Sequence, residues 1–350
     1  MPTVVSFNAP HDVALVACES EPLVQGSVRV RTWYSGVSAG TELTAYRGSN
    51  PYLTRTWDPQ ARLFLDGAPT FSYPVRGWGY SEVGEVVEAA PDVEGPVPGD
   101  VVYGIWGHRS EAVVPAAAVC DNIWTADDAL SGCFARVGAI ALNAVLASEA
   151  RLGERVVVFG QGVIGLLATR LATLSGAEVV AVDTQPGRLE AARAMGAVQT
   201  WTADVPGGPG AAVRAWSGGG VDAAIELSGS DRALNEAVRS VVVDGTVVAS
   251  GFYQGGAQHL HLGDEFHHNR VRIVASQISG TPVALGPRWN QRRLVRAFMR
   301  QVHAGRVDTG SLVTDVVAAD DVAAVFERLD RGDPDVLQAV LRFPAAPGAT

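Results

Sequence analysis

The stretch from Arg155 to Asp183 reads RVVVFGQGVIGLLATRLATLSGAEVVAVD, and it decides the fold. An apolar run leads into a glycine-rich turn, then into a helix-like segment of small and apolar residues, and then into a second apolar run. Buried parallel strands are continuous apolar runs joined by helical crossovers. The stretch therefore predicts a β–α–β unit of a parallel sheet.

The glycine-rich turn has the spacing GxGxxG, directly after the first strand and at the start of the helix. In that context the motif indicates a dinucleotide site, because the glycines allow a tight turn, a close approach of the pyrophosphate and close helix–strand packing. The helix N-terminus offers N–H groups and partial positive charge to the phosphates. The predicted cofactor-binding residues of this turn are Gly160, Gln161, Gly162, Val163, Ile164 and Gly165.

Asp183 ends the second apolar run. A carboxylate there can accept the ribose hydroxyls and repels a 2′-phosphate, which favours NAD over NADP. Arg188 is the competing signal, since an arginine nearby can pair with that phosphate, and a helix N-cap is the structural alternative for Asp183. Ligands bind outside the carboxyl ends of such strands. The later strand ends therefore add Ser228, Ser250, Gly251, Phe252 and Ser276 to the predicted cofactor site.

The composition bounds the remaining possibilities. The chain has 350 residues, 47% hydrophobic and 18% charged, which predicts about two globular domains. A net charge of -10 argues against a nucleic-acid partner and against an anionic membrane surface. We find no apolar run of about 18 residues and no signal peptide, so we expect no membrane partner and a cytoplasmic location. Three cysteines without CxxC spacing argue against a disulfide framework.

The rest of the chain predicts a second, β-rich domain. Short β-type runs broken by glycine and proline fill residues 1–127, as in a barrel or sandwich. Residues 128–275 alternate strand and helix, and residues 276–350 are expected to return to the first domain. The predicted fold class is α/β, with a doubly wound parallel-sheet domain inserted into a β-rich one.

This order of parts resembles the medium-chain dehydrogenase/reductase superfamily, the zinc alcohol dehydrogenase fold, over nearly the whole chain. The matching stretches are SGVSAGTELTAYRG, GWGYSEVGEVVEAAPDVEGPVPGDVVYG, GERVVVFGQGVIGLLA and EFHHNRVRIVASQ. The resemblance implies a GroES-like catalytic domain, a Rossmann domain, hydride transfer with a small-molecule substrate, and a homodimer or homotetramer.

The chain departs from the zinc-containing members at their metal ligands. Ala39 stands where they have a cysteine, Tyr80 stands where they have the histidine of a GHExxG segment, and the third position falls at about Ala135. Catalytic zinc needs three protein ligands and an open position. We therefore expect no metal, as in the zinc-independent branch that includes the bacteriochlorophyllide dehydrogenases, which the pairing of SGVSAGTE with GYSEVG resembles.

Without zinc, a side chain has to polarise or protonate the substrate oxygen. The resemblance suggests four candidates. The Tyr80 hydroxyl is the candidate acid, with a core aromatic as the alternative; Thr41 matches a proton-relay hydroxyl, with a helix N-cap as the alternative. Glu42 matches a supporting acidic position, with a buried arginine pair as the alternative. His108 lies in a loop that the family places over the substrate pocket, with a plain surface loop as the alternative.

The leading hypothesis is a zinc-independent, NAD(P)-dependent oxidoreductase of a secondary alcohol or ketone, with a place in specialised metabolism. One alternative is an NAD(P)H-dependent quinone or enoyl reductase that acts on a polarised C=C bond. An alternative of another class is a non-catalytic dinucleotide-binding sensor or scaffold, suggested by the missing zinc ligands.

Overall fold

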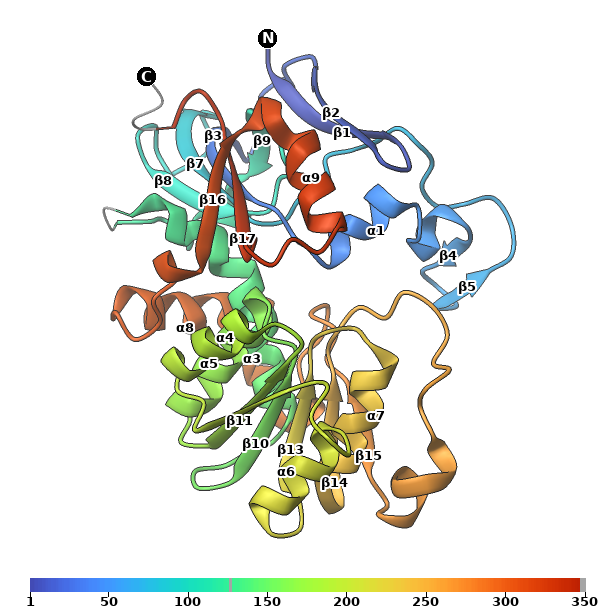
Figure 1. Ribbon diagram of the computed structural model, residues 1–350. Helices are drawn as coiled ribbons and strands as arrows, with labels where there is room; N and C mark the ends of the chain where they lie inside the picture. Colours follow the sequence, from blue (N-terminus) through green and yellow to red (C-terminus); the bar gives the residue numbers. More distant parts are fainter. Residues whose placement is uncertain (126–127, 347–350) are drawn as a thin grey trace. The chain divides into compact units, whose positions relative to one another are not determined.

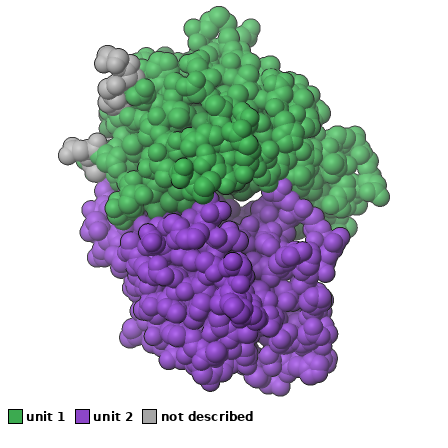
Figure 2. All heavy atoms as spheres, viewed as in Figure 1, with its two compact units in different colours: residues 1–136, 308–350 green, residues 137–307 purple. Residues whose placement is uncertain are grey.

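The computed structural model describes residues 1–125 and 128–346, and the chain divides into two compact units (Figures 1 and 2). Unit 1 comprises residues 1–136 and 308–350, and unit 2 comprises residues 137–307. Unit 1 is β-rich and unit 2 is a helix-covered parallel sheet, which confirms the predicted fold class.

Unit 2 contains one six-stranded sheet in the order β12-β11-β10-β13-β14-β15, and every neighbouring pair is parallel. Numbered within the unit, this is the order 3-2-1-4-5-6 of a Rossmann fold, in which the strand order reverses between β10 and β13. The strands are β10 (Arg155–Phe159), β11 (Glu178–Asp183), β12 (Gln199–Thr202), β13 (Val221–Glu226), β14 (Val241–Ala249) and β15 (Arg272–Ala275).

Helices cover both faces of this sheet (Figure 1). They are α3 (Ala135–Ala147), α4 (Val163–Leu174), α5 (Pro186–Ala194), α6 (Pro209–Ser217), α7 (Asp231–Ser240) and α8 (Gln291–His303), with shorter turns η3 (Leu262–Phe266) and η4 (Val283–Arg288). The strands are apolar throughout because both faces are covered: Val156, Val157 and Val158 of β10 are each 0% exposed.

Unit 1 contains a sheet in the order β16-β17-β3-β7-β8, with β9 also paired to β3, a smaller sheet β2-β1-β6, and a hairpin β4-β5. The strands are β1 (Thr3–Ala9), β2 (Asp12–Ala17), β3 (Ser27–Gly36), β4 (Thr56–Asp58), β5 (Leu63–Leu65), β6 (Val75–Arg76), β7 (Glu82–Ala89), β8 (Val101–Gly104), β9 (Glu111–Pro115), β16 (Val313–Ala318) and β17 (Gln338–Arg342). Its helices are α1 (Thr41–Arg47), α2 (Ala116–Val119) and α9 (Val322–Asp330), with turns η1 (Pro51–Leu53), η2 (Ala129–Phe134), η5 (Gly310–Leu312) and η6 (Ala319–Asp321).

Unit 2 begins at residue 137 and ends at residue 307. The predicted Rossmann domain spans residues 128–275, so the compact unit begins nine residues later and ends 32 residues later. At the second boundary, α8 stays with unit 2 because Leu294 packs in one apolar cluster with Ala139 of α3 and with Ile278. At the first boundary, η2 belongs to unit 1 because it packs closely on β7. A Cβ added to Gly132 of η2 would lie 3.0 Å from the Val83 side chain of β7. Residues 126 and 127 lie outside the described part.

The stretch Ala129–Ala147 corrects the statement that no apolar run reaches membrane-spanning length. By length and composition this 19-residue segment could cross a membrane, since an 18-residue window within it has a mean hydropathy of 1.6. However, 67% of it is buried inside the protein, and the core helix of a folded domain passes the same test.

Candidate active site and cofactor groove

The turn after β10 has the backbone that a dinucleotide groove needs. Gly160 has φ +85°, and a Cβ there would lie 2.7 Å from the backbone nitrogen of Ser228. A Cβ on Gly165 would lie 1.8 Å from the Gly160 carbonyl oxygen, so α4 can pack this closely only with glycine. Gly162 is the N-cap of α4, no side chain caps it, and no atom crowds its Cβ position. The first N–H groups of α4 are therefore open to a phosphate.

Gln161 contributes to this groove through its backbone. Its side chain points into the fold, where Nε2 donates to the Val158 carbonyl and Oε1 accepts from the Thr169 hydroxyl, both at 3.0 Å. Its backbone N–H donates to Asp183 Oδ2 at 2.5 Å. Val163 and Ile164 are half-buried and begin α4. The turn thereby holds the Asp183 carboxylate close to the N-terminus of α4, whose first N–H groups are the candidate phosphate ligands.

Asp183 is buried at the end of β11, and its second oxygen, Oδ1, accepts from the Gln185 backbone at 2.8 Å. It is not the N-cap of α5, because that position belongs to Gln185 and the helix begins at Pro186. Arg188 lies in α5, and its Nε is buried with no hydrogen-bond partner in the described part of the chain. Asp183, which favours NAD, and Arg188, which favours NADP, therefore both lie just after the carboxyl end of β11.

The later strand ends give an uneven result. Ser228 lies against Gly160 of the glycine-rich turn. Gly251 lies against the neighbouring loop, because a Cβ added to it would lie 2.3 Å from the Gly229 nitrogen. The Ser250 hydroxyl is buried and has no partner among the described residues, so it can bond a ligand. Phe252 is 42% exposed. Ser276 is committed within the fold, because its hydroxyl accepts from Asn143 Nδ2 at 3.3 Å.

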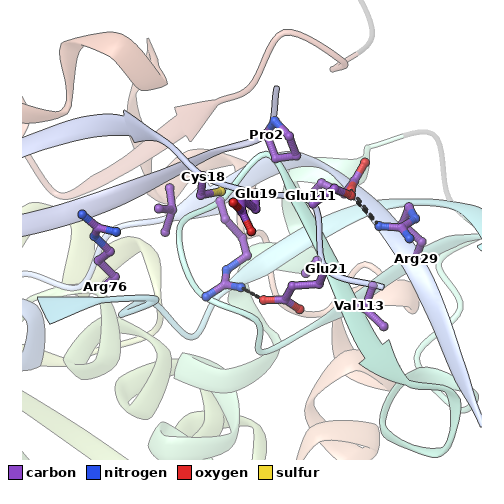
Figure 3. A pocket seen from close by; sticks show the side chains of 12 residues that line it. Pro2, Cys18, Glu19, Glu21, Arg29, Arg76, Glu111 and Val113 are labelled. Carbon is purple, nitrogen blue, oxygen red and sulfur yellow. Dashed lines mark hydrogen bonds and ion pairs between the residues drawn. The ribbon is translucent and has the colours of Figure 1, made fainter. Parts of the chain in front are cut away.

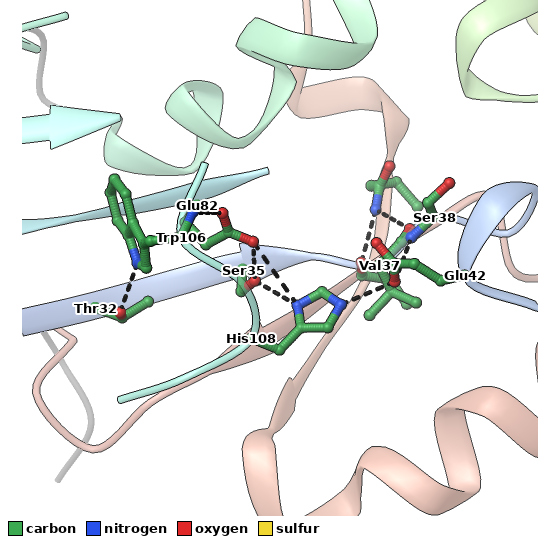
Figure 4. A network of polar contacts seen from close by, with 10 residues as sticks. Thr32, Ser35, Val37, Ser38, Glu42, Glu82, Trp106 and His108 are labelled. Carbon is green, nitrogen blue, oxygen red and sulfur yellow. Dashed lines mark hydrogen bonds and ion pairs between the residues drawn. The ribbon is translucent and has the colours of Figure 1, made fainter. Parts of the chain in front are cut away.

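Unit 1 holds a second cluster, built around a fully buried histidine (Figure 4). His108 Nε2 lies 2.8 Å from Glu42 Oε2, and Nδ1 lies 2.5 Å from the Ser35 hydroxyl. Ser35 donates onward to Glu82 Oε1 at 3.0 Å. We call Ser35, Glu42, Glu82 and His108 the His108 network; its members come from β3, α1, β7 and the loop between β8 and β9.

The His108 network favours a protonated imidazole. Burial lowers the pKa of His108, but the adjacent Glu42 and Glu82 raise it more, so the pKa lies above its usual range. Burial also raises the pKa of Glu82, against the opposing effects of His108 and the Trp106 backbone N–H, which donates to Glu82 Oε2 at 2.8 Å. An imidazolium can donate to Glu42 and to Ser35 at once, which matches the observed bonds.

Tyr80 lies beside this network. The residue is half-buried, and its hydroxyl donates to Ser38 Oγ. The Ser38 backbone N–H donates to Glu42 Oε2 at 3.1 Å. Burial and then the Glu42 charge raise the pKa of Tyr80 to about 12, while bonds with Ser38 and Thr41 act in the opposite direction. The phenol therefore keeps its proton at neutral pH and remains a donor.

Three interpretations of these residues need correction. Thr41 is not a helix N-cap, because Gly40 holds that position and Thr41 is the first residue of α1. The partner of Glu42 is His108 rather than an arginine. His108 is 0% exposed, so the alternative of a plain surface-loop residue does not hold.

The residues at the family's metal positions do not fit zinc. Ala39 and Ala135 have no donor atom on their side chains, and the Tyr80 hydroxyl is bonded to Ser38. Cys133 is buried, and burial raises the pKa of its thiol well above the usual value, so it does not favour the thiolate that zinc binds. In the described part of the chain, no group of three or more His, Cys, Asp or Glu side chains could hold a metal ion.

A separate pocket in unit 1 contains none of the predicted site residues (Figure 3). Arginine and glutamate side chains line it, and they pair with one another: Arg29 Nη1 lies 2.8 Å from Glu111, and Arg109 Nη1 lies 2.7 Å from Glu21. Because these charges compensate, we assign the pocket no part in the chemistry.

Comparisons with known proteins match this architecture. A family model described as zinc-binding dehydrogenase matches residues 163–288. The chain is 29% identical over 331 residues to D-guloside 3-dehydrogenase of Escherichia coli strain K12, covering 89% of this chain and 91% of that protein. It is 25% identical over 360 residues, or 98% of both chains, to 2-desacetyl-2-hydroxyethyl bacteriochlorophyllide A dehydrogenase of Cereibacter sphaeroides.

These matches support a place for the chain in the medium-chain dehydrogenase/reductase superfamily. They likewise support a dehydrogenase of that type. The crystal structure of 2R,3R-butanediol dehydrogenase from Bacillus subtilis shows the same superfamily fold, with a TM-score of 0.79 at 22% identity over 98% of this chain and 99% of that one. The matched segment 163–288 contains none of the three metal positions, so the family's name does not decide whether this member holds zinc.

Sequence reasoning missed several residues that the structure brings into these sites: Ser35, Ser38, Glu82, Glu226 and Tyr253. One signal was available. Glu226 directly follows the apolar residues Ala223–Ile225 at the end of β13, and a buried charge is expensive unless it is paired. Glu82 begins β7, which also contains Glu85 and Glu88, so the sequence does not single it out. Their partners come from distant parts of the chain, and no local pattern indicates which residues these are.

Proposed function

We propose that this enzyme is a zinc-independent, NAD-dependent oxidoreductase that moves a hydride between the nicotinamide and a secondary alcohol or ketone. The observation that carries the proposal is the Tyr80 hydroxyl, which stays protonated and is held by Ser38 at the position where zinc-containing relatives have a ligand. The bound cofactor supplies or accepts the hydride, and the chain's own residues handle the proton.

Tyr80 is the proposed acid in the reducing direction. In the structure the Tyr80 hydroxyl donates its one proton to Ser38 Oγ. When a carbonyl substrate binds, the phenol turns this proton to the carbonyl oxygen, and the Ser38 hydroxyl donates to the phenol oxygen in return. The hydrogen bond stabilises the negative charge that develops on the substrate oxygen. Ser38 and Thr41 contact the same hydroxyl and orient it.

Glu42 is the proposed route for the proton. One of its oxygens is bonded to His108, whereas Oε1 is buried with no hydrogen-bond partner in the described residues. A buried carboxylate oxygen without a partner is costly, so this atom is suited to accept a bond from a substrate hydroxyl or a water. His108 acts as a positioning residue that fixes Glu42 through the 2.8 Å contact between Nε2 and Oε2.

The preference for NAD rests on Asp183, a buried carboxylate at the end of β11, where the dinucleotide fingerprint has the acidic residue that bonds the ribose and would repel a 2′-phosphate. Arg188 opposes it, because its unpartnered Nε could pair with that phosphate. Equilibrium binding of NADH and NADPH to the wild type and to the Asp183→Ala and Arg188→Ala variants separates the two effects. We expect NADH to bind more tightly to the wild type and Asp183→Ala to reduce or reverse the difference. Tighter NADPH binding by the wild type would overturn the assignment.

The reaction class is tested by cofactor oxidation with a panel of ketones and a matched panel of enones, run with NADH and with NADPH. Turnover of ketones with NADH supports the proposal. Turnover of enones alone would instead support the quinone or enoyl reductase, and binding without any turnover would support a sensor or scaffold.

We also propose a homodimer or homotetramer that works in the cytoplasm, as the superfamily resemblance suggests, with a substrate from specialised metabolism. Sedimentation equilibrium of the purified chain checks the oligomeric state.

A further inference from the structure

Glu226 is a buried carboxylate that the proposed reaction does not use. It ends β13, is 0% exposed, and both of its oxygens are bonded. Oε1 accepts from the backbone N–H of Ser228 at 2.7 Å and from the hydroxyl of the same residue. Oε2 accepts from the Tyr253 hydroxyl at 2.5 Å and from the Gly229 backbone at 3.2 Å.

These bonds tie the ends of two strands together. Ser228 and Gly229 follow β13, whereas Tyr253 follows β14. The Glu226 carbonyl oxygen also accepts from the backbone N–H groups of Ser250 and Gly251, both at 2.9 Å. One residue therefore fixes the loop after its own strand and the loop after the next strand.

The same loop sets the wall of the phosphate-binding turn. A Cβ on Gly160 would lie 2.7 Å from the Ser228 nitrogen, so the turn after β10 rests directly on a residue that Glu226 holds. A Cβ on Gly251 would lie 2.8 Å from Glu226 Oε2. The turn after β10 thus packs on Ser228, and the loop after β14 packs on the Glu226 carboxylate that holds Ser228.

A buried carboxylate is a costly way to terminate a strand. Burial raises the pKa of Glu226, and the bonds from Ser228, Tyr253 and Gly229 act against that rise. Packing alone does not require a charge at the end of a strand. We therefore attribute the presence of Glu226 to the positions in which its bonds hold the loops after β13 and β14.

We propose that Glu226 and Tyr253 are positioning residues that hold the loops after β13 and β14 at the spacing required by the nicotinamide half of the dinucleotide. The inference rests on the proposed cofactor. In this strand order the first mononucleotide-binding half is β10 to β12 and the second is β13 to β15. Since Asp183, the proposed ribose ligand, belongs to the first half, the adenosine lies there and the nicotinamide falls to the second half.

The division into halves makes a specific prediction for Tyr253→Phe. This change removes one hydroxyl and leaves Glu226 bonded to Ser228 and Gly229, so no buried donor loses its partner. The loop after β14 loses its side-chain bond to Glu226. NADH should therefore bind more weakly by about fivefold, while ADP-ribose, which lacks the nicotinamide, should bind as to the wild type.

The experiment measures dissociation constants of NADH and ADP-ribose, and the melting temperature without ligand, for the wild type, Tyr253→Phe and Tyr73→Phe. Tyr73 is the matched control, because its half-buried hydroxyl also makes one bond, to the Ala45 carbonyl in unit 1. Selective loss of NADH affinity in Tyr253→Phe alone supports the inference. Unchanged NADH affinity, or equal loss for both ligands, would overturn it. If the wild type binds neither ligand, the proposed cofactor itself is wrong.

A second variant covers the case in which Tyr253→Phe is destabilised. Glu226→Gln keeps an oxygen for the Ser228 bonds but places an amide N–H₂ against the Gly229 N–H, where two donors face each other. We expect it to reduce NADH affinity more than Tyr253→Phe does, again with a smaller effect on ADP-ribose. Equal effects of Glu226→Gln on the two ligands would contradict the assignment to the nicotinamide half.

Discussion

The cofactor groove of unit 2 and the His108 network of unit 1 differ in how they hold polar groups. The groove is shaped largely by backbone: glycines permit close approaches, and the N-terminus of α4 presents its N–H groups. The His108 network consists of side chains, with two carboxylates, a hydroxyl and an imidazole buried together. Backbone groups are positioned by the fold itself, whereas buried side-chain charges depend on one another.

This difference predicts how each region fails. When one glycine of the backbone site is changed, ligand affinity should fall, and the stability should fall only by the local strain, about 1–3 kcal/mol. A network of buried charges should lose stability when one member is removed, because its partners remain buried and unpaired.

His108→Asn is expected to have the largest effect. It leaves Glu42 and Glu82 without their cation and should lower the free energy of unfolding by about 4 kcal/mol. Urea unfolding measures the change. His11→Asn is the control, since its side chain is 57% exposed, lies 3.5 Å from Asp330 and contacts the Tyr46 ring, and it should cost about 0.5 kcal/mol at most. If adding Glu42→Gln to His108→Asn recovers no stability, the two residues are not coupled as described.

Gly160→Ala should act on the other region and in the other way. An alanine at φ +85° and 2.7 Å from the Ser228 nitrogen forces the turn to shift, which should weaken NADH binding by about 30-fold. Gly187→Ala in α5 is the control, because no atom lies within 4 Å of its added Cβ. Equal NADH affinities for Gly160→Ala and Gly187→Ala would show that the turn after β10 does not bind the cofactor.

Tyr80→Phe should lower turnover at least about tenfold with little change in NADH affinity, because the hydroxyl acts on the substrate oxygen and not on the cofactor. Steady-state kinetics with a ketone found in the panel gives the turnover, and a direct titration gives the affinity. Tyr73→Phe again serves as the control. Unchanged turnover in Tyr80→Phe would exclude the phenol as the acid.

The smallest effect is the ionisation of the Tyr80 phenol, which is expected at about pH 12 rather than near the usual 10. The pKa in the folded protein lies above that in the unfolded chain, so the stability contributed by the protonated phenol is complete below pH 10 and is lost as the pH rises towards 12. The phenolate absorbance of the wild type minus that of Tyr80→Phe reports this titration. A midpoint near 10 would show that burial and the Glu42 charge do not raise the pKa of this phenol as described.

The two regions also differ in how much of them the sequence predicts. The turn from Gly160 to Gly165 is a local pattern that one β–α–β unit contains completely, so its place and role followed from spacing alone. Tyr80 and Thr41 could be found only through the family resemblance. Ser38 precedes Ala39, the residue that stands at the position of the zinc-ligating cysteine. Its bond to Tyr80 joins residues 42 positions apart, so no local pattern indicates it.

The remaining parts depend on tertiary packing. The pairing of Glu42 with His108 spans 66 residues, and nothing near either residue indicates the other. The second compact unit extends to residue 307, beyond the predicted bound of 275, because α8 and α3 share an apolar cluster although they lie far apart in the chain. Tyr253 was missed for the same reason: its partner, Glu226, lies on another strand.

The central claim is that hydroxyl and carboxyl groups of the chain, and not zinc, handle the substrate oxygen. Metal analysis of active protein purified without chelator, with activity measured before and after dialysis against a chelator, tests this claim most directly. The account predicts far less than one zinc per chain and full activity after dialysis. About one zinc per chain, with activity lost on its removal and restored by its return, would contradict it.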